Sequence, residues 1–258
     1  MAPEQNNIPR TTGKDPASYK KRTYRKIIDP AGLFSTQITI RETDLQIMAG
    51  CDVSLAASHF VILYRAQLEN YLHNHPVFLS SLRPLEYDPL APALIKSMLQ
   101  AAESAGVGPM AAVAGTIAEY VGQDLIAAGN KEIIIENGGD IFMARQQACQ
   151  VAVFAGESPL SYKIGIKIAK ERMPLGVCTS SGTVGHSLSF GRADSVTVLA
   201  PSTPLADAAA TRLANELKDE SDINHCLEVA QDIRGISGVI VIKNEKLGVW
   251  GEVELVTL

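Results

Sequence analysis

The sequence has few aromatic residues, no basic excess and no long apolar run. Aromatic residues make up 5% of the chain, and Trp250 is its single tryptophan, so a base-stacking surface for nucleic acid is not expected. The net charge of −5 also argues against a nucleic-acid partner. No apolar run reaches the roughly 18 residues that a membrane span requires. We therefore expect neither nucleic acid nor a membrane as a partner.

Paired cysteines and a secretory signal are also missing. The four cysteines show no C-x-x-C pair and no zinc-site spacing. The first residues include basic side chains but no apolar core behind them, unlike a secretory signal. Reduced thiols without such a signal are typical of the cytoplasm, which is the location that we expect.

The composition is otherwise that of a globular protein. The 258 residues are 46% hydrophobic and 20% charged, which suffices for a sizeable core. The charge is uneven, because residues 1–26 carry seven basic side chains and two acidic ones. This stretch predicts a basic flexible arm in solvent, and an electrostatic contact for an acidic partner is the alternative. We expect one domain over 27–258.

Hydrophobic periodicity predicts a cluster of helices followed by a cluster of strands. A hairpin is expected around a turn at 41–44, because apolar and polar residues alternate on both sides of it. Little regular βαβ alternation is present, which favours an α+β fold with helices packed on a mostly antiparallel sheet. Helices are expected over 54–73, 91–104, 109–128 and 204–217, and strands over 133–135, 141–143, 151–154, 162–168, 176–179, 196–200, 239–242 and 249–256.

Two glycine-rich segments could bind an anion. The first is Glu136-Asn137-Gly138-Gly139-Asp140 between two apolar strands, where paired glycines allow positive φ and let N–H groups point at a ligand. A plain hairpin is the alternative, because Asn-Gly is a favoured turn.

The second segment is Thr179-Ser180-Ser181-Gly182, which follows an apolar strand and could equally be a flexible loop. Cys178 precedes it and His186 follows eight residues later, so an imidazole-stabilised thiolate is one interpretation. A small buried thiol is the other interpretation of Cys178.

Two helices add candidate oxygen ligands. Asp207 and Thr211 are four residues apart and share a helix face, where both could bind Mg²⁺ or Ca²⁺. Alternatively, Asp207 only complements the helix N-terminus. Gly108 lies in a glycine-rich loop that leads into a helix, a weaker anion-binding signal. Glu119, further along that helix, is a candidate acid or base, or a solvated residue.

These segments, in order, resemble the motifs of ApbE, the FAD:protein FMN transferase. The matching segments are Gly115–Ala118, Asn137–Asp140, Thr179–Gly182 and Ala206–Thr211. The resemblance implies a divalent cation on Asp207 and Thr211, with a backbone carbonyl of Ala114 or Gly115 as a further ligand. It also implies a flavin nucleotide in a pocket that the Gly-Gly and Thr-Ser segments line.

A closer resemblance is to a UPF-class branch of the ApbE-like superfamily, on the runs 107–115, 136–140 and 178–191. It covers about residues 20–258, and some members of that branch have been linked to sulfide incorporation in homocysteine synthesis. The chain departs from ApbE at Glu119, where ApbE has lysine, and at Cys178, where it has alanine. The stretch from His186 to Arg192 also lacks the proline of ApbE.

Three functions follow from these residues. The leading one is an enzyme, a transferase in the ApbE-like manner, that binds a small anionic molecule beside a cation, with Asp140 or Glu119 as acid or base. The second is a sulfur-metabolism protein that uses Cys178 with His186. The third is a ligand-binding protein without catalysis. The alternating strands also predict a homodimer, because exposed strand edges invite pairing.

Overall fold

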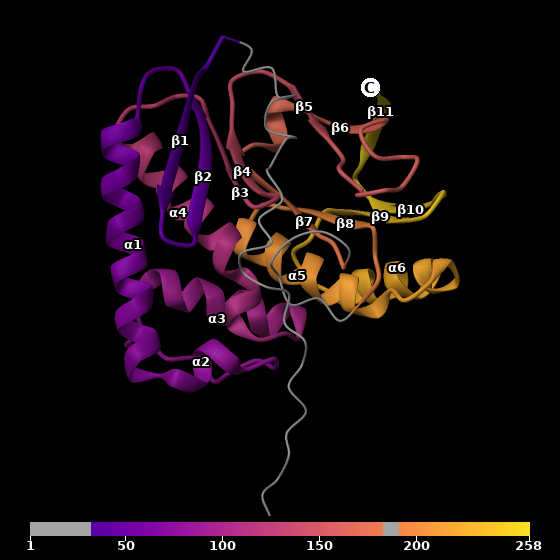
Figure 1. Ribbon diagram of the computed structural model, residues 1–258, viewed down its shortest axis with the longest axis horizontal. Coiled ribbons are helices and arrows are strands. Elements are labelled where there is room, and N and C mark those ends of the chain that lie inside the picture. The colour runs from indigo at the N-terminus through magenta and orange to yellow at the C-terminus, as the bar shows by residue number, and fades with distance from the viewer. Residues whose placement is uncertain (1–31, 183–190) are drawn as a thin grey trace, which may run out of the picture.

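The computed structural model describes residues 32–182 and 191–258, which form helices packed on two antiparallel sheets (Figure 1). The predicted arm at 1–26 lies outside the described residues. The helices are α1 (Ser54–Asn74), α2 (Pro76–Ser80), α3 (Ala93–Ala105), α4 (Val113–Ala127), α5 (Thr203–Glu216) and α6 (Ile223–Asp232), with 3-10 turns η2 (Pro109–Ala112), η3 (Lys170–Arg172) and η4 (Glu220–Asp222).

The larger sheet has eight strands in the order β1-β2-β3-β4-β7-β8-β9-β10, and every neighbouring pair is antiparallel. The second sheet has the order β11-β6-β5. The strands are β1 (Phe34–Ile40), β2 (Thr43–Ala49), β3 (Ile133–Asn137), β4 (Asp140–Ala144), β5 (Cys149–Ala152), β6 (Ile164–Ile168), β7 (Leu175–Ser180), β8 (Ser195–Ala200), β9 (Gly238–Lys243), β10 (Lys246–Gly251) and β11 (Glu254–Thr257).

Three apolar clusters hold these layers together. One joins α3, α5 and α6 to β7–β9, and a second joins α1 and α4 to β1–β4. The third lies between the two sheets and includes Met143, Val177 and Ile166. Helices therefore cover one face of the large sheet and the small sheet covers the other, as the α+β prediction requires.

The structure corrects the sequence-based prediction at several boundaries. The hairpin turn is only Arg41-Glu42, because β2 already begins at Thr43. The helix expected from Pro109 starts as the 3-10 turn η2 before α4. The single strand expected over 249–256 is two strands in different sheets, and Gly251, at φ 80°, ends the first. The prediction missed α2 and α6, which are short.

Candidate functional site

Helix α5 carries the two predicted cation ligands into the interior. It begins behind Ser202, whose side-chain oxygen accepts a hydrogen bond from the Leu205 N–H at 3.4 Å. Asp207 and Thr211 are both buried on it. The alanines around Asp207 are buried too, so α5 lies close to its neighbours on several sides.

Gly115 of α4 brings that helix against α5. A Cβ atom at Gly115 would lie 2.7 Å from the Thr203 carbonyl oxygen and 2.9 Å from Asp207 Cβ. Only glycine therefore permits this contact. The Gly115 N–H donates a hydrogen bond to Asp207 Oδ2 at 2.8 Å. Asp207 thus binds the backbone of a neighbouring helix and does not simply complement its own N-terminus.

The Glu136–Asp140 segment is a two-residue hairpin turn between β3 and β4. Gly138 and Gly139 have φ values of 73° and 110°, the left-handed region that favours glycine. The Gly139 N–H donates to Glu136 Oε1 at 2.8 Å, so a carboxylate already engages this amide. The segment therefore has hairpin geometry, which places Asp140 opposite Cys178 on β7.

This turn also reaches the predicted backbone ligand of α4. The Asn137 side chain donates from Nδ2 to the Ala114 carbonyl oxygen at 3.0 Å. The structure therefore brings the turn, the Ala114-Gly115 segment and Asp207 together, three regions that are distant in the sequence.

Buried acids concentrate here. Burial raises the pKa of Asp207 to about 7, although N–H groups of Gly115 and Ala114 oppose the shift. Burial, followed by the charge of Asp207, raises the pKa of Asp140 well above its usual range. No ion pair between residues in the described ranges reaches either aspartate. The two acids therefore destabilise each other's charged form.

Glu119 contacts the backbone at the start of α5. Its Oε2 accepts a hydrogen bond from the Thr203 N–H at 2.6 Å, and its Oε1 accepts one from Gln123 Nε2 at 3.0 Å. Burial raises the pKa of this carboxyl, and the Thr203 bond partly offsets the shift. Glu119 is thus neither simply solvated nor free, because it occupies an N–H group at a helix N-terminus that could otherwise face an anion.

Cys178 is fully buried on β7. Its thiol lies 3.5 Å from the Thr203 carbonyl oxygen, to which it donates. Burial, then the charges of Asp140 and Asp207, raise the pKa of this thiol well above its usual range. The nucleophilic form of cysteine is the thiolate, so this environment favours the unreactive thiol. His186, the predicted partner, lies outside the described residues.

The residues after Cys178 are placed by β7 and by the strand beside it. The Thr179 N–H donates to the Gly139 carbonyl oxygen at 3.2 Å, which ties this segment to the turn. The Gly182 N–H donates to the Ala193 carbonyl oxygen at 2.9 Å, and the Ser181 hydroxyl lies 3.5 Å from the same oxygen. The Ser180 hydroxyl is buried and has no hydrogen-bond partner among the described residues.

Gly108 has a packing role. A Cβ atom there would lie 1.8 Å from the Ser81 carbonyl oxygen, so only glycine fits against this backbone. Thr203, at the start of α5, is not among the predicted site residues. Its carbonyl oxygen accepts from the Cys178 thiol and its N–H donates to Glu119, while its buried hydroxyl has no hydrogen-bond partner within the described ranges. A Thr-Pro helix start is common, and its local pattern cannot show what packs against it.

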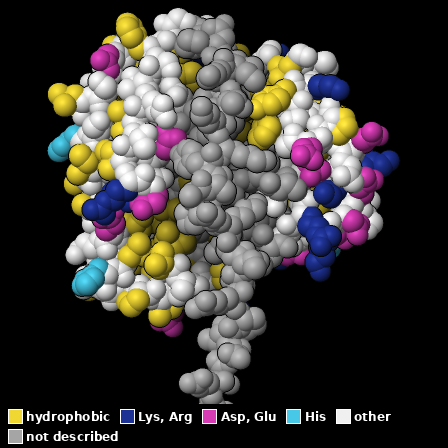
Figure 2. Space-filling model, in the orientation of Figure 1, with side chains coloured by type: hydrophobic (Ala, Val, Ile, Leu, Met, Phe, Trp, Pro, Cys, Tyr) yellow, Lys and Arg dark blue, Asp and Glu magenta, His cyan; other side chains and the backbone are white. Residues whose placement is uncertain are grey.

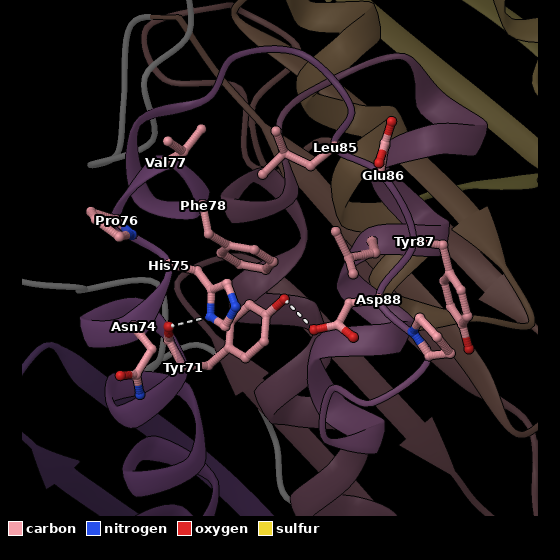
Figure 3. Close-up of a pocket in the computed structure, with 12 residues that line it drawn as sticks. Tyr71, Asn74, His75, Pro76, Val77, Phe78, Leu85, Glu86, Tyr87 and Asp88 are labelled. Carbon is pink, nitrogen blue, oxygen red and sulfur yellow. Dashed lines mark hydrogen bonds between the residues drawn. The ribbon is translucent and has the colours of Figure 1, made fainter.

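A cavity of about 590 Å³ lies apart from these residues, between α1, α2 and the segment that follows α2 (Figure 3). Tyr71 stacks on His75 with ring centroids 4.0 Å apart, and its hydroxyl donates to Asp88 Oδ2 at 3.0 Å. None of the predicted site residues lines this cavity. It therefore gives no support to any of the predicted functions.

The residues present offer a hard cation such as Mg²⁺ only a few oxygen atoms, namely those of Asp207, Thr211 and the Ala114 carbonyl. Within the described ranges, no three His, Cys, Asp or Glu side chains group to hold a metal ion. No helix in those ranges is long and apolar enough to cross a membrane.

Comparisons with known proteins agree with the resemblance. A model of the family described as AbpE bacteria matches residues 25–245. The UPF0280 protein of Methanococcus aeolicus is 44% identical over 222 residues, which cover 84% of this chain and 90% of that protein. The UPF0280 protein of Methanosarcina acetivorans is 38% identical over 220 residues, or 84% of this chain and 87% of that protein.

Solved structures share the fold at low identity. The apo form of the flavinyl transferase ApbE of Pseudomonas stutzeri has a TM-score of 0.52 at 13% identity, covering 85% of this chain and 94% of that chain. The ApbE protein of Thermotoga maritima gives 0.51 at 10%, covering 84% and 96%. With a family model that spans most of its length and relatives at 38–44% identity, this chain belongs to the AbpE bacteria family, with the UPF0280 proteins, and has an ApbE-like fold.

Proposed function

We propose that this protein binds a small phosphorylated anion, a flavin nucleotide or a related molecule, through a divalent cation held at Asp207. The observation that carries the proposal is the pair of buried aspartates, Asp140 and Asp207, whose pKa values are raised and which no ion pair within the described ranges neutralises. A buried carboxylate without a cation is costly, and a bound cation removes that cost.

The ligands are oxygen atoms. Asp207 and Thr211 contribute a carboxylate and a hydroxyl from one helix face, and the Ala114 carbonyl contributes a third oxygen. Asn137 fixes the orientation of that carbonyl through its 3.0 Å bond. Oxygen donors of this kind, completed by water and ligand phosphates, are typical of Mg²⁺. When bound, such a cation supplies an electrophile or template for phosphate oxygens.

The acids themselves explain why the anion requires the cation. Asp140, Asp207 and Glu136 lie in one region, and their ionised forms would repel a phosphate. Glu119, where ApbE has lysine, adds negative charge instead of a phosphate contact. The unpartnered Ser180 hydroxyl can donate to or accept from a ligand next to this region.

The test is equilibrium dialysis of FAD, FMN and ADP against the full chain, with Mg²⁺ and with a chelator. Asp207→Asn removes the charge but keeps the shape of the side chain. Asp194→Asn is the matched control, because Asp194 is equally buried at 8% but pairs with Lys243 at 3.3 Å.

We expect Mg²⁺-dependent binding of at least one nucleotide, weakened more than tenfold in Asp207→Asn and unchanged in Asp194→Asn. Absence of binding by the wild-type chain, or equal binding with the chelator, would contradict the proposal. Equal loss in both variants, with normal circular dichroism, would show that Asp207 has no special role.

A further inference from the structure

The cavity beside α2 is separate from the proposed cation site, whose residues do not line it. It has a volume of about 590 Å³ and lies between the end of α1, α2 and the segment that leads from α2 to α3. The buried side chains of Tyr71, Phe78 and Leu99 line it (Figure 3). Cavities of this size hold small molecules, and an apolar lining with a few polar groups is usual in such sites.

Aromatic rings line the cavity on two sides. Tyr71 stacks on His75 with ring centroids 4.0 Å apart, and Phe78 meets Tyr71 edge to face at 5.3 Å. Figure 3 shows Tyr87, from the segment after α2, on the other side of Asp88 from these three rings. The face of an aromatic ring is electron-rich, so these rings favour a cation that lies over them.

The charge of the lining has one sign. Glu86 and Asp88 line the cavity, and none of the described residues that line it is Lys or Arg. No ion pair between residues in the described ranges reaches either carboxyl group. Figure 2 shows hydrophobic side chains around α2 and α3 at the lower left, whereas most Lys and Arg side chains in view lie over α6 and β10. The cavity therefore attracts a cation and repels an anion.

Asp88 is held in place as an ionised acceptor. Its Oδ1 accepts a hydrogen bond from the Leu90 N–H at 2.9 Å, and its Oδ2 accepts one from the Tyr71 hydroxyl at 3.0 Å. These bonds, that of Leu90 first, hold the pKa of Asp88 below its ordinary value, so the carboxyl is ionised at neutral pH. Burial, then the bond to Asp88, raises the pKa of Tyr71 to about 12, so this hydroxyl keeps its proton. A carboxylate that is already oriented loses little freedom when a ligand binds.

We propose that this cavity binds a small organic cation, an alkylammonium with an apolar body, whose N–H groups donate to Asp88. The apolar body lies against the aromatic rings, and Glu86 adds a second negative charge. An anion of the same shape is repelled by the two carboxylates, and a neutral molecule gains only the apolar contact. The proposal is independent of the cation site at Asp207, so either can fail without the other.

The test compares three probes that share a phenyl ring on a two-carbon chain. They are 2-phenylethylamine, 2-phenylethanol and 3-phenylpropanoate, which end in a cation, a neutral hydroxyl and an anion. The full chain is titrated at pH 8, where a free imidazole is neutral and an alkylammonium is charged. NMR signals of the Val77, Leu85 and Leu99 methyl groups, which line the cavity, report where each probe binds and its dissociation constant.

We expect saturable shifts of these methyl signals with the amine, and binding of the alcohol and the anion that is weaker by about tenfold or more. Asp88→Asn keeps the shape of the side chain and should weaken amine binding about tenfold, with alcohol binding nearly unchanged. Glu86→Gln should weaken amine binding about threefold, because Glu86 is exposed. Glu245→Gln is the control: it makes the same charge change in the exposed β9–β10 turn and should alter binding less than about twofold.

Absence of saturable amine binding overturns the proposal, and so does equal binding of the amine and the alcohol. An Asp88→Asn variant that is folded by circular dichroism and binds the amine as tightly as the wild type also overturns it. If Asp88→Asn does not fold, Glu86→Gln decides the matter, because its carboxyl group is exposed and pairs with no described residue. Amine binding in Glu86→Gln equal to that in Glu245→Gln would then contradict the proposal.

Discussion

Charged groups are handled in opposite ways in two regions of the molecule. Beside α1, Arg41, Glu42, Arg65 and Glu69 form a connected set of ion pairs at the surface. In the site region, Asp140 and Asp207 are buried next to each other, and no ion pair in the described ranges reaches them. The first arrangement stabilises the fold, whereas the second opposes it. A protein keeps such a cost where a ligand removes it.

The largest expected effect concerns Asp207. Its pKa is raised to about 7, so its contribution to stability is full below the unfolded-state pKa near 4 and is lost as the pH rises to 7. A shift of about three pKa units corresponds to roughly 4 kcal/mol. In Asp207→Asn, the unfolding free energy should therefore fall less between pH 4 and pH 7 than it does in the wild type. Urea denaturation with a chelator present measures this difference.

Asp140 and Glu119, whose pKa values are also raised, should leave a residual slope of the same sign in that variant. Added Mg²⁺ should reduce the slope in the wild type only, because a cation replaces the proton on the carboxylate. A wild-type chain that gains stability steadily from pH 4 to 7 would contradict the assignment.

A smaller effect is expected at Arg65, where a substitution should lower the unfolding free energy. Its side chain is only 12% exposed and binds Glu42, Glu69 and the Thr43 hydroxyl. Arg65→Ala should lower the unfolding free energy by about 2 kcal/mol at pH 7, because hydrogen bonds to charged groups are lost. Arg41→Ala is the control. Arg41 is exposed and pairs only at the surface, so its loss should cost less than about 1 kcal/mol.

The smallest effect concerns the thiols of the two regions. Cys51, after β2, is exposed, whereas Cys178 is buried with a raised pKa. A disulfide reagent at pH 8 should modify Cys51 rapidly and leave Cys178 unmodified until the chain unfolds, as peptide mass spectrometry can show. Rapid modification of Cys178 in the folded chain would restore the interpretation in which this residue carries sulfur.

Much of the architecture follows from local pattern. Alternating apolar residues predicted the β1–β2 hairpin, and the Asn-Gly pair predicted a turn between β3 and β4, which the structure places at Gly138-Gly139. Both signals depend on a few adjacent residues. Helix α6 was missed because it is only ten residues long. The separation of β10 from β11 was missed because an apolar run does not show which sheet each half joins.

The sequence by itself determined that Asp207 and Thr211 share a helix face, because their spacing of four follows from helix geometry. It also indicated that the paired glycines Gly138 and Gly139 permit positive φ, because they lack Cβ atoms. The tertiary structure alone decided that Asp140 lies near Asp207, that Gly115 binds Asp207, and that Glu119 binds the start of α5. These contacts join residues that are far apart along the chain. Burial and charge proximity, which set the pKa values, exist only once the layers have packed.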